Sequence, residues 1–180
     1  MKIRNGLELM VAGLVALTLF GAWVTSARAQ TSPAGFPNVV GALRTTPGCL
    51  GVETAQTSSG KQVIFAWFEN KKALVDWYHG DVHQKAMKTV FPNGTFDRQP
   101  LPDLAEDSGA ILAIVSVKFV GTPRTDATSP PISSIGIELY GPLPGGLAVG
   151  GRFAPEALKV RGLREIDIGK AQGRPQGGSQ

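Results

Sequence analysis

Cysteine and histidine are scarce in this chain of 180 residues, which contains one cysteine and two histidines. A single cysteine excludes an intrachain disulfide, so stability must come from the hydrophobic core and from any association between subunits. Cys49 precedes an expected strand, where a small buried hydrophobe is its simplest role. Lysine and arginine are scattered and form no stripe with aromatic side chains, which argues against nucleic acid as a partner.

Long apolar runs are also lacking, with one exception near the N-terminus. This run, Leu9–Val24, covers about 16 residues, follows Lys2 and Arg4, and is followed by Ala-Arg-Ala at 27–29. The pattern predicts a signal peptide over residues 1–29 and a periplasmic or secreted protein that has no membrane contact after cleavage. The run is shorter than the roughly 20 residues of a transmembrane helix. An uncleaved N-terminal membrane anchor is the alternative.

Cleavage would leave 151 residues, the length of one domain. The leader carries more positive than negative charge, so the net charge of +4 would fall to about +2 in the mature chain. We expect residues 30–37, rich in proline, to be a flexible lead-in and residues 38–168 to form a single α+β domain. Residues 169–180 contain mainly glycine, glutamine, proline and serine, which predicts a disordered tail.

Hydrophobic periodicity predicts the order helix, strand, strand, helix, strand, strand. Gly80 lies within the second helical segment and predicts a kink there, or two helices that meet. The expected elements are a short helix at 39–43, a hairpin of strands 50–55 and 62–68, a helical segment at 71–90, strands at 110–120 and 135–140, a return strand at 147–153 and a short helix from 155.

The strand at 62–68 is apolar on both faces. Val63, Phe65 and Trp67 alternate with a second apolar set. An antiparallel sheet with one face in water would carry polar residues on that face. We therefore expect helices on one face of the sheet and the sheet of a second subunit on the other.

Three segments carry a resemblance to a known family: Pro47-Gly48-Cys49-Leu50-Gly51, Phe65-Ala66-Trp67, and Ala73 through Trp77. Residues 38–91 resemble the antibiotic-biosynthesis monooxygenase family. The resemblance implies an α+β fold with a ferredoxin-like antiparallel sheet, helices on one face, and a homodimer in the form of a dimeric α+β barrel. Members open with a strand before the first helix, and residues 110–120 would supply that strand in permuted order, beside strand 62–68 and parallel to it.

The same resemblance implies an oxidoreductase that acts on a small aromatic or polyketide-like compound without a cofactor, and the leader implies that it is exported. Trp67 and His83 are the candidate catalytic residues. The ligand-binding residues would be Trp67, Trp77, Tyr78, His79, His83 and Met87.

The alternative is a non-catalytic dimeric domain that binds heme or another apolar ligand. In related heme-degrading monooxygenases a helical histidine binds iron, and Met87 occupies its place here, with His83 one turn earlier as a substitute. A structural dimer without activity is a third possibility. Asp76, His79 and His83 could approach one another on a continuous helix. The segment lacks the glutamate of a metalloprotease helix, and a break at Gly80 would part the two histidines, so no metal site is predicted.

Overall fold

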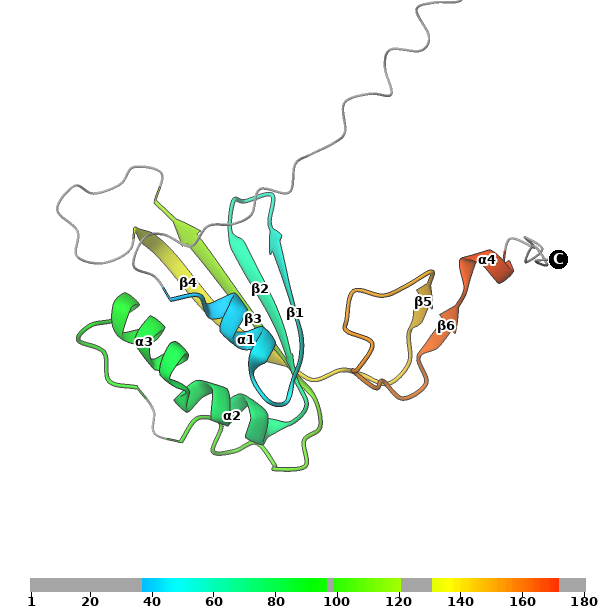
Figure 1. Ribbon diagram of the computed structural model, residues 1–180, viewed down its shortest axis with the longest axis horizontal. Coiled ribbons are helices and arrows are strands. Elements are labelled where there is room, and N and C mark those ends of the chain that lie inside the picture. Colours follow the sequence, from blue (N-terminus) through cyan, green and yellow to red (C-terminus); the bar gives the residue numbers. More distant parts are fainter. Residues whose placement is uncertain (1–36, 97–98, 121–130, 172–180) are drawn as a thin grey trace, which may run out of the picture. The chain divides into compact units, whose positions relative to one another are not determined.

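The computed structural model describes residues 37–96, 99–120 and 131–171 of the chain (Figure 1). The predicted signal peptide, nearly all of the lead-in, and the tail beyond residue 171 lie outside these residues. Within the described part, no helix is long and apolar enough to span a membrane.

A four-stranded antiparallel sheet forms the centre of the domain. Its strands, in spatial as well as chain order, are β1 (Cys49–Gln56), β2 (Gln62–Phe68), β3 (Ile111–Phe119) and β4 (Ile132–Tyr140). The turn between β1 and β2 is closed by Thr57, whose N–H donates to the carbonyl of Lys61, and Gly60 adopts the positive φ of 80° that this turn requires. The predicted α+β class with an antiparallel sheet is confirmed.

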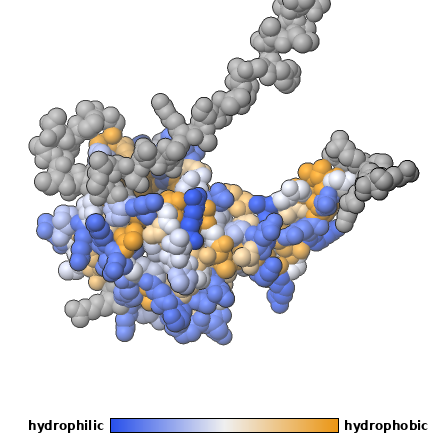
Figure 2. Space-filling view, viewed as in Figure 1, coloured by the Kyte–Doolittle hydropathy of each residue, from blue (hydrophilic) through white to orange (hydrophobic). Residues whose placement is uncertain are grey.

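Three helices cover one face of this sheet (Figure 1): α1 (Val39–Thr45), α2 (Lys71–His79) and α3 (Asp81–Val90). Asn38 and Asn70 begin α1 and α2, because their side-chain oxygens accept hydrogen bonds from the N–H groups of Gly41 and Ala73, each over 2.9 Å. The predicted interruption at Gly80 is confirmed as a boundary between two helices. Hydrophilic residues gather over the helical side in Figure 2.

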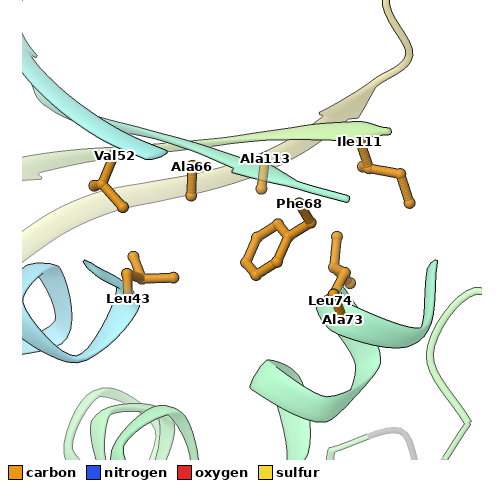
Figure 3. Packing of buried hydrophobic residues seen from close by; sticks show 8 residues of the cluster. All are labelled: Leu43, Val52, Ala66, Phe68, Ala73, Leu74, Ile111 and Ala113. Atoms are coloured by element: carbon orange, nitrogen blue, oxygen red, sulfur yellow. The ribbon is translucent and has the colours of Figure 1, made fainter. Parts of the chain in front are cut away.

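The core lies between the sheet and these helices (Figure 3). Phe68 is its centre, with 1% of its surface exposed, and it points from β2 toward α2. The cluster consists of Val52, Ala66, Phe68, Ile111 and Ala113 from the sheet, with Leu43, Ala73 and Leu74 from the helices. Alternate residues of β2 therefore supply the buried layer that the sequence pattern predicted.

The predicted parallel orientation of β2 and β3 is wrong. The strands are neighbours, as expected, but they pair antiparallel, with Phe68 opposite Ile111 and Gln62 opposite Val117. The reason is the segment after α3, which returns the chain to the start of α2. Lys71 fixes that return, because its Nζ donates to the carbonyl of Leu104 over 2.7 Å and lies 2.8 Å from a carboxylate oxygen of Glu106.

The second face of the sheet is covered in part by the same chain. Phe153 packs edge-on against Phe65 and Trp67, with ring centroids 4.9 and 5.3 Å away. Pro155 lies against Gly51 so closely that a Cβ at residue 51 would sit 2.7 Å from the proline Cβ. Trp67 is consequently only 4% exposed. Part of the cover that we expected from a second subunit is thus intramolecular.

The C-terminal segment differs from the sequence prediction in three ways. Strand β5 (Leu147–Val149) is shorter than expected and pairs in parallel with β6 (Arg164–Ile166), which the sequence did not indicate. The predicted helix from Pro155 is a single turn, closed by a bond from the N–H of Leu158 to the proline carbonyl. Residues 169–171 of the predicted tail belong to the short helix α4 (Ile168–Ala171).

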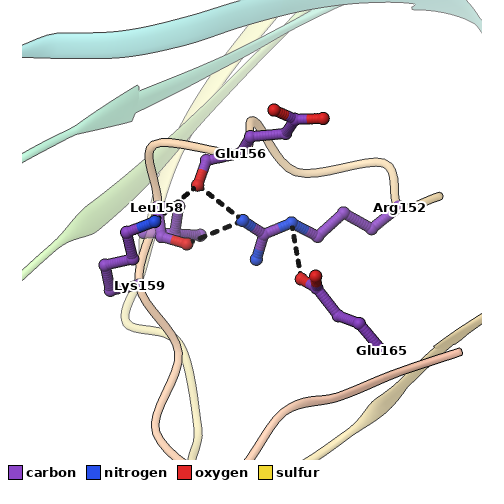
Figure 4. A network of polar contacts seen from close by, with 5 residues as sticks. All are labelled: Arg152, Glu156, Leu158, Lys159 and Glu165. Carbon is purple, nitrogen blue, oxygen red and sulfur yellow. Dashed lines mark hydrogen bonds and ion pairs between the residues drawn. The ribbon is translucent and has the colours of Figure 1, made fainter.

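A largely buried arginine organises this segment (Figure 4). Nη2 of Arg152 donates to the carbonyl oxygens of Glu156 and Leu158, over 2.8 and 2.9 Å, and Nε lies 3.6 Å from a carboxylate oxygen of Glu165. One guanidinium thus holds the loop before β6 and connects it to that strand. These bonds compensate for the few apolar residues that so short a segment buries.

Candidate functional site

The junction of α2 and α3 brings together most of the residues predicted to bind a ligand. Helix α2 ends at His79. The last carbonyl groups of a helix have no hydrogen-bond partners within that helix. The Tyr78 carbonyl accepts two side-chain hydrogen bonds, from His83 Nδ1 over 2.8 Å and from Gln84 Nε2 over 2.6 Å. The first turn of α3 therefore caps the end of α2.

This hydrogen bond fixes the tautomer of His83. A carbonyl oxygen can only accept a hydrogen bond, so Nδ1 must carry the proton. In the neutral ring Nε2 then holds a lone pair, and no group of the described residues donates to it. A neutral imidazole held in this way is suited to accept a proton or to bind a metal ion.

The surroundings keep His83 neutral. Burial, aided by the nearby His79, lowers the pKa of His83 below the usual value, and the bond to the Tyr78 carbonyl acts in the opposite direction. Burial disfavours the charged form because an imidazolium loses hydration there. His83 is consequently unprotonated at neutral pH, the form that a base requires.

Aromatic rings surround this imidazole. The centroid of the His83 ring is 5.1 Å from that of Tyr78 and 5.8 Å from that of Trp77. Tyr78 also packs edge-on against His79, with centroids 5.1 Å apart. Trp77 contacts the hydrophobic core, so it connects this ring cluster to the sheet. We call Trp77, Tyr78, His79 and His83 the kink cluster.

Trp67 does not belong to the kink cluster. It lies on the face of the sheet opposite to the core residues Ala66 and Phe68, where Phe65 and Phe153 are its ring partners. The sheet thus separates the two predicted catalytic residues, Trp67 and His83. Met87 is half-buried on α3 and, four residues after His83, projects from the same side of that helix.

Other reactive groups are engaged elsewhere. Asp76 forms an ion pair with Lys72 at 2.6 Å. Within the described ranges, no group of three or more histidine, cysteine or carboxylate side chains could hold a metal ion. Burial raises the pKa of the Cys49 thiol, whose Sγ lies 3.7 Å from the Gly51 carbonyl, so this thiol is a poor nucleophile.

Two depressions lie outside the kink cluster. One is an open, polar depression of about 410 Å³ on α3, lined by Asp81, Gln84, Lys85, Lys88 and Thr89. Gln84 connects this depression to the kink cluster through the Tyr78 carbonyl. The other, of about 570 Å³, lies in the C-terminal segment beside Arg152. None of the four residues of the kink cluster lines either depression.

Comparisons with known proteins add no identification. No family model matches the chain, and neither a curated protein nor a solved structure matches it. The evidence for a function therefore lies in the geometry of the kink cluster.

The sequence did not single out Gln84 or Phe153. The expected break at Gly80 could have indicated Gln84, because this residue follows His83 directly and supplies a second donor near the start of α3. Phe153 gave no such signal, because its partners Phe65 and Trp67 are far away in the sequence.

Proposed function

We propose that this chain is an exported domain that binds a small aromatic compound at the kink cluster, with Nε2 of His83 as the acceptor of its acidic proton. The observation that carries this proposal is the bond from His83 Nδ1 to the Tyr78 carbonyl. It leaves the free lone pair on Nε2 of a neutral imidazole whose ring lies beside those of Trp77 and Tyr78.

The chemistry is that of a cofactor-independent monooxygenase. Nε2 of His83 takes a proton from an activated C–H group of an electron-rich aromatic substrate such as an anthrone. The carbanion then reduces O₂, one oxygen atom enters the substrate as a carbonyl, and the other leaves as water. The Trp77 and Tyr78 rings suit a planar substrate, because aromatic rings attract each other in stacked or edge-on arrangements.

Binding of heme without catalysis is the second candidate. Its supporting observation is the position of Met87 one turn after His83 on α3, which offers a thioether and an imidazole on the same side of one helix. Both proposals use the free Nε2. They differ in whether Nε2 binds the heme iron or accepts a proton from a substrate.

The test uses residues 30–180 and a variant of His83 that keeps the hydrogen bond to the Tyr78 carbonyl but cannot accept the substrate proton. Asparagine at residue 83 carries an amide N–H near the place of Nδ1, so His83→Asn keeps a donor for the Tyr78 carbonyl but removes the imidazole. We expect oxygen uptake with an anthrone-type substrate, and its loss in His83→Asn with unchanged circular dichroism. Lys72→Ala, an exposed position on α2, is the matched control and should retain full uptake.

Hemin titration distinguishes the second candidate. A Soret band that weakens in both His83→Asn and Met87→Ala supports heme binding. If the folded protein shows neither oxygen uptake nor a Soret band, both proposals fail and a structural role is left.

Export and self-association complete the proposal. Cleavage after residue 29 should give a mature N-terminus at Gln30, which N-terminal sequencing of the protein from its host would detect. An intact leader on the membrane-bound protein would instead support the anchor. The homodimer with a ferredoxin-like barrel is supported by the two apolar faces of β2, although Phe153 already covers part of one face.

A further inference from the structure

Strand β4 is an outer strand of the sheet, and no strand among the described residues pairs with its outer edge. The strand order ends at β4, which uses one side to pair with β3 through eight of its nine residues, all but Ser133. Natural outer strands are usually protected against pairing by lysine, proline or a covering segment. In Ile132–Tyr140 the protective feature of this kind is a bulge at Ser133, near the start of the strand. The strand contains neither lysine nor proline, and Glu138 is its only charged residue.

This strand also exposes apolar side chains. Ile137 is 52% exposed, Leu139 38% and Tyr140 48%. The other outer strand, β1, is different, because no large hydrophobic side chain of β1 is exposed and its exposed residues are those from Glu53 to Gln56. The edge suited to bind another strand is therefore that of β4.

The sequence of β4 is complementary to itself in one orientation. We infer that β4 of a second copy binds this edge antiparallel, about a two-fold axis through Gly136, to give a continuous eight-stranded sheet. In this register Ile135 of each copy faces Ile137 of the other copy, so the symmetry produces two such pairs. On either side of these pairs Ser134 of one copy faces Glu138 of the other, and the bulge at Ser133 ends the regular pairing beyond them.

Charge favours this orientation over the parallel one. In the antiparallel register each Glu138 carboxylate faces the small, neutral Ser134 of the other copy. Parallel pairing in register would place the two Glu138 carboxylates side by side, which is unfavourable. Tyr140 donates a hydrogen bond from its hydroxyl to Glu138 within one chain, so the carboxylate already has a partner. Gly136 puts no side chain on the axis.

Pairing along this edge involves neither Phe65 and Trp67 nor His83. The outcome of its test therefore does not depend on the proposed chemistry.

Disulfide trapping tests the register. Residues directly opposite in antiparallel strands have Cα atoms roughly 4.5–5.5 Å apart, within the range that a disulfide spans. In a Cys49→Ser background, the double variant Ser134→Cys/Glu138→Cys should form a covalent dimer under mild oxidation. Ser134→Cys alone should not, because residue 134 faces residue 138 of the other copy. A dimer from the single variant would show that residue 134 faces itself, in a parallel pairing or in an antiparallel pairing centred on residue 134, and would refute the register.

Sedimentation velocity over a dilution series tests the surface itself. Ile137 is half-exposed in one chain, so Ile137→Lys should fold normally but raise the dimer dissociation constant at least about tenfold, because it places lysines in the apolar pairs. Lys61→Ala, in the β1–β2 turn, is the control and should leave the constant unchanged. A monomer at every concentration, or a dimer that Ile137→Lys leaves intact, overturns the inference.

Discussion

Replacing Gly51 with alanine tests whether the C-terminal segment packs on the sheet as described. The new Cβ would lie 2.7 Å from Cβ and 2.9 Å from Cγ of Pro155. Carbon atoms prefer separations of about 3.5–4.0 Å, so the proline must move by roughly 1 Å. Both atoms belong to a rigid ring, and a rotamer change cannot relieve the contact.

The cost follows from overpacking, which is typically about 1–3 kcal/mol. Alanine also lowers the conformational entropy of the unfolded chain, which raises the free energy of unfolding by roughly 0.4–1 kcal/mol. We therefore expect a net loss of about 1–2 kcal/mol in the free energy of unfolding, equivalent to a fall in Tm of roughly 3–8 °C for a domain of this size. The alternative response is displacement of the segment, which would expose Trp67.

Both responses can be measured on residues 30–180. Differential scanning calorimetry gives Tm, and the tryptophan emission in a Trp77→Phe background reports the exposure of Trp67. Gly141→Ala is the matched control, because a Cβ at that glycine meets nothing within 4 Å. If the Gly51 and Gly141 variants have the same Tm and the same emission maximum, the packing of Pro155 on β1 is refuted.

Three further predictions concern the core, the loop before β3 and the kink cluster. Phe68→Ala should lower the free energy of unfolding by about 3–5 kcal/mol in urea denaturation, since the ring is fully buried. Lys71→Met should lower it by about 1–3 kcal/mol and speed proteolysis of the loop, because the Leu104 carbonyl loses its donor. The exposed ion pair of Lys72 should contribute under about 0.5 kcal/mol, so Lys72→Met is the control. NMR titration should give His83 a midpoint below about 6.5.

The sign of the pH effect follows from that lowered pKa. Below the pKa of the unfolded chain, the unfolded state binds a proton at residue 83 that the folded state does not. The free energy of unfolding should therefore fall as pH drops below about 6.5 and stop falling once the folded His83 is also protonated. His83→Asn should remove this dependence, and an unchanged pH profile in that variant would contradict the assignment to His83.

Local features were predictable from the sequence because they depend on near neighbours. The hairpin followed from alternation around the Thr57–Gly60 turn, and the helix boundary followed from Gly80. The orientation of β3 was not predictable in this way. It depends on whether the segment after α3 runs back along the helices, and Lys71 with Leu104 decides that through a contact 33 residues apart.

The candidate site was predictable in part for the same reason. Tyr78, His79 and His83 are close in the sequence, so a helix junction brings them together. Trp67 was grouped with them from the resemblance, but alternation along β2 places it on the other face from Phe68. That alternation was visible in the sequence, and the structure follows it and not the grouping that the resemblance implied.

The contact of Phe153 with Trp67 bears on where the domain ends. A chain stopped after Tyr140 would keep all four strands of the main sheet and yet lose the only described side chain whose ring packs edge-on over the indole. Such a fragment would expose a large aromatic surface and tend to aggregate. Expression of this protein, and any fusion at its C-terminus, should therefore retain the chain at least through Ala171.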